Sequence, residues 1–571
     1  MSLFDTLPKT AAEAHDWVWA QYAPFGEDLL ARDLSGENLD AFMRDWTALS
    51  DVLSEVQSRA AVATTLDTTD KEAEEYYLNF YKTIYPNLAK LTDKLNRILI
   101  DSGLVPQNYD VPLRYVRTEV ELFREENLPL ITELQELTTQ YDKIIGAQTV
   151  TWHGEEKTLA QMRPVFLNGS REEREQAFTL VKDRRLQDRQ ALNELWVKMF
   201  RIRQQMAKNA GFNNFLDYTW KNYGRLDYTP ADVQQFHQAI GQVVVPAVER
   251  LNEKLKHKLD LDTLKQWDTE AKDSSVPHLK PFTKGDELAD VSARIFQQVD
   301  PDLGGYFQTM RDEDLLNLDN YKGKAPGGYC TGYSMVKRPF IFMNSVGLHD
   351  DVQTMLHEAG HAFHVFEAAD WPYVGQNHAP IEFCEVASMS MELIAAPYLK
   401  KADGGFYSES EAARARMEHL EGMLVFWPYM AVVDAFQQWA YTSGEAALDP
   451  ANCDAKWTEL WHRFKKGVDY IGQEDWVATG WQRKLHIFTV PLYYIEYGIA
   501  QLGAAQVWAN SLTDQAEALA AYRRGLSLGN TGTLPQLFEA AGAKLSFDAE
   551  TLSRMVDLIE KTIDELDATV A

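Results

Sequence analysis

The sequence predicts a mainly α-helical globular protein that is interrupted by one short β region. Apolar residues recur at intervals of three and four through residues 40–60 and 71–102, among many charged residues. This spacing is typical of amphipathic helices that bury one face. Between residues 323 and 344 the chain instead becomes rich in Gly and aromatic residues, and residues 338–344 have the composition of a strand. The helical spacing then returns and continues to the end of the chain.

The helical pattern before residue 211 is broken at one place. Residues 150–159 combine β-branched and aromatic residues around Gly154, which indicates a small hairpin. Ser170 with Glu173 three residues later resembles a capping box that opens another helix. A further helical stretch runs from about residue 230 to 270, and the Ser and Pro residues at 274–277 predict a loop after it.

The charge balance excludes some classes of partner. The chain of 571 residues carries 85 acidic and 56 basic side chains, a formal net charge of −29. A field of this sign repels nucleic-acid phosphates and anionic lipid surfaces. We therefore expect neither nucleic acid nor a membrane among its partners.

The cysteines and the start of the chain bear on location. Three widely spaced cysteines, Cys330, Cys384 and Cys453, do not form a disulfide framework. The segment 1–30 lacks a basic stretch followed by an apolar one, as a signal peptide would have. Apolar runs also stay short of the ~18 residues that a membrane span requires. A cytoplasmic location is the resulting expectation.

One segment carries a metal-binding motif. His357, Glu358 and His361 form H-E-x-x-H, within a stretch that begins with Asp350 and Asp351 as a helix N-terminus would. Residues i and i+4 lie on one helical face, so both imidazoles can reach one zinc ion at ~2.0 to 2.1 Å, with Glu358 beside the open coordination position. The alternative interpretation is an ordinary helix that happens to carry two histidines.

A catalytic zinc usually needs a third protein ligand. The metzincin pattern requires Gly three residues and His six residues after the second histidine, and this chain has His364 and Glu367 there. A carboxylate from a second helix is the remaining common solution. Residues 379–393 predict a buried helix of that kind, apolar all round except for its glutamates.

Three glutamates in this helix must find a cation or hydrogen bonds, because an isolated buried charge is very costly. We interpret Glu385 as the metal ligand. Glu392, seven residues on and on the same face, would orient a histidine or instead pair with an arginine. Glu382 is interpreted as a residue of the helix start. His364 rivals Glu385, although three ligands from one straight helix would strain a tetrahedral site.

Several separated motifs resemble the thimet-oligopeptidase-like zinc metallopeptidase family. They are R-P-F-I-F-M-N at residues 338–344, H-E-A-G-H-A-F-H at 357–364 and E-V-A-S at 385–388, in the family's order and spacing. Weaker similarity at residues 210–215 and 501–504 extends the likeness over about residues 200–560. The resemblance implies one zinc ion per chain, held by His357, His361 and Glu385.

The same resemblance implies an architecture and a substrate class. It implies a mainly α, two-lobed helical body around a deep substrate channel, with a small β-sheet next to the H-E-x-x-H helix. We expect residues 1–200 to form an N-terminal helical region with the hairpin, and residues 201–571 to form the catalytic region. Short peptides are the implied substrates, because a deep channel would exclude folded proteins.

Transition-state donors are also implied by the resemblance. His486, Tyr494 and Tyr497 are the residues chosen for this role, and Tyr493 stays open in place of Tyr494. Without the resemblance, tyrosines at helical spacing would be interpreted as core packing with a hydroxyl at its edge. The segment from Gly327 to Cys330 resembles the part of the family that contacts the substrate backbone.

The sequence thus predicts a zinc oligoendopeptidase that cuts internal peptide bonds with metal-activated water and Glu358 as general base. Two alternatives remain. The same scaffold could act as a zinc carboxypeptidase, which would need a group that captures the peptide terminus. A catalytically silent peptide-binding helical protein with structural zinc is the other, although structural zinc normally has four closed protein ligands.

Overall fold

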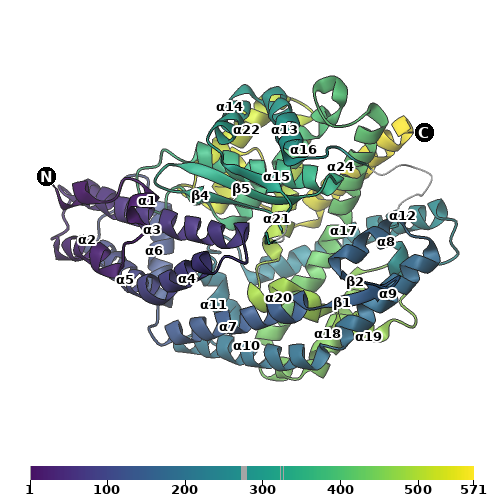
Figure 1. Ribbon diagram of the computed structural model, residues 1–571, viewed down its shortest axis with the longest axis horizontal. Coiled ribbons are helices and arrows are strands. Elements are labelled where there is room, and N and C mark those ends of the chain that lie inside the picture. Colours follow the sequence, from purple (N-terminus) through teal and green to yellow (C-terminus); the bar gives the residue numbers. More distant parts are fainter. Residues whose placement is uncertain (1, 272–278, 322, 326, 571) are drawn as a thin grey trace.

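The computed structural model describes residues 2–271, 279–321, 323–325 and 327–570. The loop predicted at residues 274–277 lies outside these ranges. The prediction of a mainly α-helical fold is confirmed, since helices form most of the described chain and strands form two small sheets (Figure 1).

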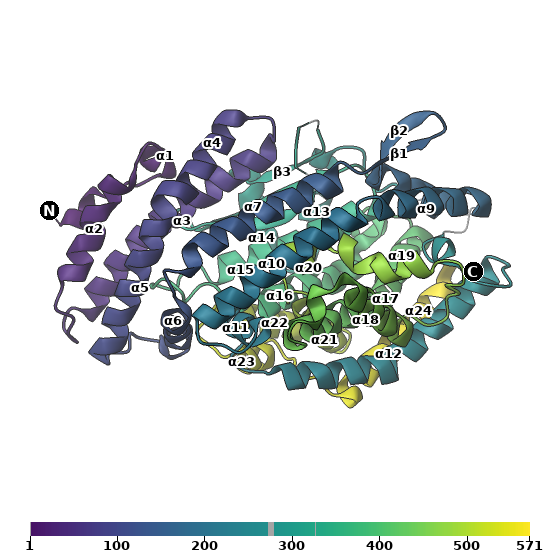
Figure 2. The ribbon, with the colours of Figure 1, turned by 90° about the horizontal axis from the view of Figure 1, so that it is seen from below.

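The N-terminal part of the chain, as far as Gly146, consists of helices and their connections. Residues 40–60 and 71–102 are helical as predicted, although a π-helical turn, Phe80–Ile84, divides the second stretch. The helices of this part are α1 (Ala11–Ala14), α2 (Trp19–Ala31), α3 (Leu39–Leu66), α4 (Lys71–Asn79), α5 (Tyr85–Ser102), α6 (Asp110–Leu122) and α7 (Asn127–Gly146). Helices α1 to α5 lie together at one end of the molecule (Figures 1 and 2).

A hairpin and a second group of helices follow. Strands β1 (Thr149–Trp152) and β2 (Glu155–Thr158) pair antiparallel at the predicted position. Ser170 caps α9 through the capping box with Glu173. The helices are α8 (Arg163–Asn168), α9 (Arg171–Leu186), α10 (Arg189–Asn209), α11 (Phe215–Asn222) and α12 (Pro230–Lys258). Helix α12 stops well before residue 270, because Leu259 leaves the helix and Asp260 adopts a positive φ of 52°.

The second sheet positions the metal-binding motif. Its strand order is β3 (Leu316–Asp319), β5 (Arg338–Ser345) and β4 (Tyr329–Tyr333), with β5 parallel to β3 and antiparallel to β4. Strand β5 covers the predicted strand at residues 338–344. Helices α13 (Gly285–Val299), α14 (Pro301–Asp312) and α15 (His349–Glu367) contact this sheet, and α16 (Ile381–Ala395) packs on α15 (Figure 1). Helix α15, which carries the motif, packs against β4 and β5.

The C-terminal part supplies the remaining walls. Its helices are α17 (Glu409–Thr442), α18 (Pro450–Phe464), α19 (Glu474–Ala478), α20 (Leu485–Thr489), α21 (Ile495–Ser511), α22 (Gln515–Ser527), α23 (Leu534–Ala540) and α24 (Ala549–Val570). A 3-10 turn, Thr479–Arg483, joins α19 to α20. Helix α21 packs closely on α16 and also contacts α17.

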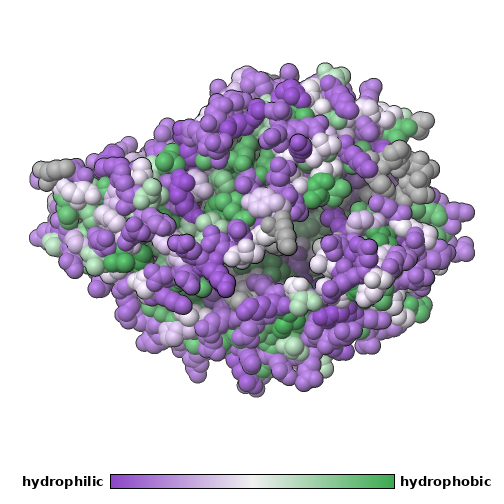
Figure 3. All heavy atoms as spheres, in the orientation of Figure 1, coloured by the Kyte–Doolittle hydropathy of each residue, from purple (hydrophilic) through white to green (hydrophobic). Residues whose placement is uncertain are grey.

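Two large apolar cores hold the chain together. One is built mainly by residues 4–116, and the other runs from α7 and α10 through the sheet to α24. The visible face of the molecule is hollowed near its middle, below α15 and close to α21 (Figure 3). Among the residues that the structure describes, no helix combines the length and apolar character needed to cross a bilayer.

Candidate metal centre

Helix α15 presents the H-E-x-x-H residues from a well-defined start. Asp351 in its first turn accepts hydrogen bonds from the backbone N–H groups of Val346 and Leu348, both at 2.8 Å. An acidic side chain at this end also suits the helix dipole. His357 and His361 then follow one turn apart, with ring centroids 4.9 Å from each other.

Gly360 allows the second helix to approach. A Cβ atom at this position would lie 2.6 Å from Cα of Ser388 and 2.7 Å from the carbonyl oxygen of Ala387. Any larger residue would therefore push α15 and α16 apart. The glycine inside the motif is what lets Glu385, one turn before Ser388, reach the two histidines.

The three predicted ligands converge. Oε2 of Glu385 lies 3.3 Å from Nε2 of His357 and 3.7 Å from Nε2 of His361. These atoms form a group that could hold one metal ion. Two ligands of a tetrahedral ion bound at about 2.0 to 2.2 Å lie roughly 3.3 to 3.6 Å apart, so the spacing suits zinc.

The electrostatics of the cluster also suit a cation. Burial alone would raise the pKa of Glu385, but hydrogen bonding to His357 and the nearby imidazoles keep it below its ordinary value. Burial lowers the pKa of His361 to about 4, which leaves its imidazole neutral with a free lone pair. Against the effect of burial, bonds to two carboxylates raise the pKa of His357 well above its ordinary value. A divalent ion would supply the positive charge that a proton on His357 otherwise provides.

Glu392 contacts the first histidine, as expected. Its Oε1 lies 2.7 Å from Nδ1 of His357, and its Oε2 lies 2.8 Å from Nε2 of His419 on α17. Ser388 donates a hydrogen bond of 3.2 Å to Oε2 of Glu385. These bonds fix the orientation of two of the three ligands. Sequence reasoning missed His419 and Ser388, and only the E-V-A-S pattern could have indicated the serine.

Glu358 lies beside the cluster in a buried position. It is 7% exposed, and burial raises its pKa to about 7. The backbone N–H of Cys330, on strand β4, donates a hydrogen bond to its carboxylate and opposes this rise in pKa. The sheet therefore places one edge strand next to the carboxylate that would act as base.

The predicted donors from the C-terminal part form one aromatic cluster. The ring of His486, on α20, lies 6.1 Å from that of Tyr497 and 4.9 Å from that of Tyr494. Burial, followed by the charge of Lys484, lowers the pKa of His486 to about 4. The imidazole is thus neutral and can donate one N–H.

The three tyrosines differ in the charges and rings that lie near them. Burial raises the pKa of Tyr497 and of Tyr493, and the charge of Glu385 adds to the rise in both. Tyr497 also experiences the charge of Glu358 and a hydrogen bond with Tyr493. Tyr494 shares Phe426 with Tyr497, packs against Tyr429, and has the Lys484 amine 3.9 Å from its ring centroid. The charge of Glu385 thus acts on Tyr497 and Tyr493, whereas Tyr494 is the tyrosine whose ring lies nearest to that of His486, and its role stays a prediction.

Two further residues lie outside the cluster. His364, the rival ligand, is buried with its ring 5.8 Å from that of Phe383.

Glu382 lies in the first turn of α16 and accepts a hydrogen bond of 2.6 Å from the hydroxyl of Tyr228. Arg225 lies 3.7 Å from the same carboxylate and 2.7 Å from Glu496. Glu382 belongs to a buried ionic network that joins α16 to α21.

A His–His–Glu cluster, with the glutamate of an H-E-x-x-H helix buried beside it, is an arrangement that metallopeptidases with this motif use. The chain belongs to Peptidase family M3, whose sequence model matches residues 166–557. The match includes every predicted site residue.

Similar proteins support this assignment and confirm the resemblance to oligoendopeptidase F. The chromosomal oligoendopeptidase F of Lactococcus lactis subsp. cremoris is 24% identical over 343 residues, which are 57% of this chain and 53% of that protein. The aligned part thus spans about half the length of this curated relative. The structure of PZ peptidase A with an inhibitor is 25% identical, has a TM-score of 0.88 and covers 98% of this chain and 99% of that one. A protein assigned as oligoendopeptidase F is 26% identical, with a TM-score of 0.87 and 98% coverage of both chains.

Proposed function

We propose that this protein is a zinc-dependent oligoendopeptidase that hydrolyses internal bonds of short peptides. The observation that carries the proposal is the convergence of His357, His361 and Glu385, with Glu358 buried beside them. The names of the relatives, oligoendopeptidase F and PZ peptidase A, support the same class of activity.

Glu358 is the proposed general base. A zinc ion held by the three ligands would polarise the peptide carbonyl and lower the pKa of water towards ~7. Glu358 would accept the proton of the attacking water and then deliver it to the leaving amine. Its pKa of about 7 is close to the value at which a group can both accept and release a proton near neutral pH.

Tyr497 and His486 are the proposed donors to the oxyanion. Both have a proton to donate at neutral pH, because burial raises the pKa of Tyr497 and the neutral imidazole of His486 retains one N–H. Tyr493 would assist through its hydrogen bond with Tyr497. Donors placed where negative charge develops stabilise the transition state more than the substrate.

The proposed preference for short peptides rests on how a peptide would reach the metal centre. The hollow in Figure 3 lies between the part that carries α15 and the part that carries α20, so an extended peptide would enter between them. In this proposal residues 201–571 supply the catalytic groups and residues 1–200 form one wall. A cytoplasmic location and the lack of nucleic-acid and membrane partners stay predictions.

The test is mass spectrometry of the products from a mixed library of short peptides, with and without a chelator. We expect cuts at internal bonds, lost with chelator and restored by added Zn²⁺. Trimming from the C-terminus alone would favour a carboxypeptidase. If the purified protein bound no transition metal and added Zn²⁺ produced no hydrolysis, the proposal would be wrong.

A further inference from the structure

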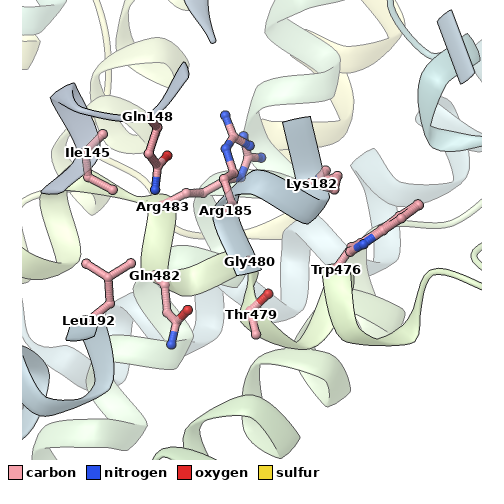
Figure 4. Close-up of a pocket in the computed structure, with 10 residues that line it drawn as sticks. All are labelled: Ile145, Gln148, Lys182, Arg185, Leu192, Trp476, Thr479, Gly480, Gln482 and Arg483. Carbon is pink, nitrogen blue, oxygen red and sulfur yellow. The ribbon is translucent and has the colours of Figure 1, made fainter. Parts of the chain in front are cut away.

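A basic pocket is lined in part by the turn that precedes α20, the helix of His486. It is small, with a cavity volume of about 20 Å³, and is lined by residues from the end of α7, α9, α10, α19 and the 3-10 turn before α20. Its cationic side chains are Lys182, Arg185 and Arg483. Figure 4 shows the guanidinium groups of Arg185 and Arg483 next to each other.

These three cations lack the acidic partners that nearby arginines in the sequence have. Arg184 and Arg189, on either side of Arg185, pair with Asp188 and Asp454. Within the described part of the chain, Lys182, Arg185 and Arg483 form no salt bridge, and their own charges act on one another. Arg483 is exposed, and Arg185 and Lys182 are half-buried, so an anion from solvent could reach these unpaired charges and form charge-assisted hydrogen bonds with them.

The side-chain amides that line the pocket already form hydrogen bonds within the protein. Gln148 donates to Asp188 at 2.8 Å, and Gln482 donates to Asn193. The two guanidinium groups and the Lys182 ammonium are therefore the donors that remain for a guest. Two adjacent guanidinium groups offer planar forks that match a carboxylate.

The electrostatics agree with this geometry. Burial, followed by the charge of Arg483, lowers the pKa of Arg185 to about 9. Burial and both arginines lower the pKa of Lys182, and Glu270, which is exposed, is the acidic group that opposes the shift. An anion bound between these groups would relieve their repulsion.

The segment that lines the pocket also carries residues of the proposed donor cluster. Arg483 and His486 are three residues apart on one segment, and Lys484 between them contacts the rings of Tyr429 and Tyr494 at 5.4 and 3.9 Å. Tyr494 in turn touches His486 and Tyr497. A peptide held near Tyr497 could thus extend toward the pocket.

We propose that Lys182, Arg185 and Arg483 bind a carboxylate of the peptide substrate, an inference that rests on the proposed function. Because the net charge is −29, a local group of three positive charges offers an acidic peptide a favourable site on a molecule whose overall field repels it. The carboxylate could be the C-terminus of the peptide or an Asp or Glu side chain. Either would be recognised by the same charge-assisted hydrogen bonds.

The test compares kcat/KM for matched short peptides. One pair differs only in a free or amidated C-terminus, and a scanning series replaces Asp by Asn at each position. For the wild-type enzyme we expect the preferred carboxylate to raise kcat/KM about tenfold over its amide, the size expected for hydrogen bonds to charged groups. In the double variant R185Q/R483Q this preference should vanish, while kcat/KM for amide peptides changes little.

Controls separate charge from folding. Arg483→Lys keeps the charge and should retain most of the preference, and Arg201→Gln removes an exposed charge from α10 and should change nothing. Loss of the preference for free C-termini would assign the terminal carboxylate, and loss for one Asp position would assign a side chain. Equal loss for acidic and amide peptides, or no loss, would overturn the proposal.

Failure of the proposed activity gives a different result. If the wild-type protein cuts none of these peptides, the binding of the same acidic and amide pairs, measured by calorimetry, still tests the pocket. Tighter binding of the acidic member that is lost in R185Q/R483Q would support the carboxylate site on its own. Equal binding of both members would overturn it.

Discussion

Nδ1 of His357 lies 2.7 Å from Oε1 of Glu392, one of two carboxylates that hold this imidazole. Burial would raise the pKa of Glu392, but hydrogen bonds from His357 and His419 lower it to about 2. An ionised Glu392 makes Nδ1 the donor, so Nε2 is the nitrogen that would offer its lone pair once a metal ion replaced the proton shared with Glu385. The hydrogen bond selects the tautomer that a metal requires.

Glu392→Gln should therefore weaken zinc binding. Loss of an outer partner typically costs about 10- to 100-fold in metal affinity, and we expect a loss in that range. Competition with a chromophoric chelator measures it. Glu409→Gln, an exposed change at the start of α17, serves as the control. An unchanged zinc affinity in Glu392→Gln would show that the hydrogen bond does not orient the ligand.

Tyr497→Phe and Tyr494→Phe should separate the two tyrosines. Tyr497 experiences the charges of Glu385 and Glu358, whereas Tyr494 packs against Tyr429 and has the Lys484 amine 3.9 Å from its ring centroid. Removing an oxyanion donor typically lowers kcat about 10²- to 10³-fold, and this loss is expected for Tyr497→Phe with zinc content unchanged. Tyr494→Phe should lose clearly less activity than that. The reverse order would return Tyr494 to the site.

Gly360→Ala should disturb the cluster through packing alone. The added methyl group would meet the backbone of Ser388 and Ala387, and overpacking of this kind costs about 1 to 3 kcal/mol. Urea unfolding measures the loss of folding free energy, and zinc titration should show weaker zinc binding because Glu385 moves away from the two histidines.

Gly422→Ala is the matched control, since its Cβ would meet nothing within 4 Å. A helical Gly→Ala change in open space should be neutral or stabilising by up to about 1 kcal/mol. Equal stability of the two variants would contradict the packing argument.

The sequence was sufficient to predict which residues come together where their placement depends on local spacing. His357, Glu358 and His361 are fixed by one helical turn, and Glu385 follows from the high cost of an unpaired carboxylate in an apolar helix. Helices α3, α9 and α15 were also predictable from periodicity and caps. In each case the deciding interactions lie within a few residues along the chain.

Long-range contacts could not be predicted in the same way. His419 on α17 meets Glu392 on α16, and nothing near His419 in the sequence indicates that contact. The choice between Tyr493 and Tyr494 depends on how the start of α21 is rotated against α16, and the spacing of residues along the sequence does not define that rotation.

Helix α12 ended earlier than predicted because Asp260 leaves the helical region of backbone space. The pocket around Arg185 and Arg483 joins α9 to the turn before α20, two segments that are distant in the sequence.

Glu358→Gln should separate metal binding from chemistry. The amide keeps the shape of the side chain but cannot accept the proton of water, so peptide hydrolysis should fall by at least about 10²- to 10⁴-fold, the usual contribution of a general base. Zinc content, measured by elemental analysis, should stay at one ion per chain because Glu358 is not among the three converging ligands. Loss of zinc in this variant would make Glu358 a ligand, and retained hydrolysis would assign the proton transfer to another group.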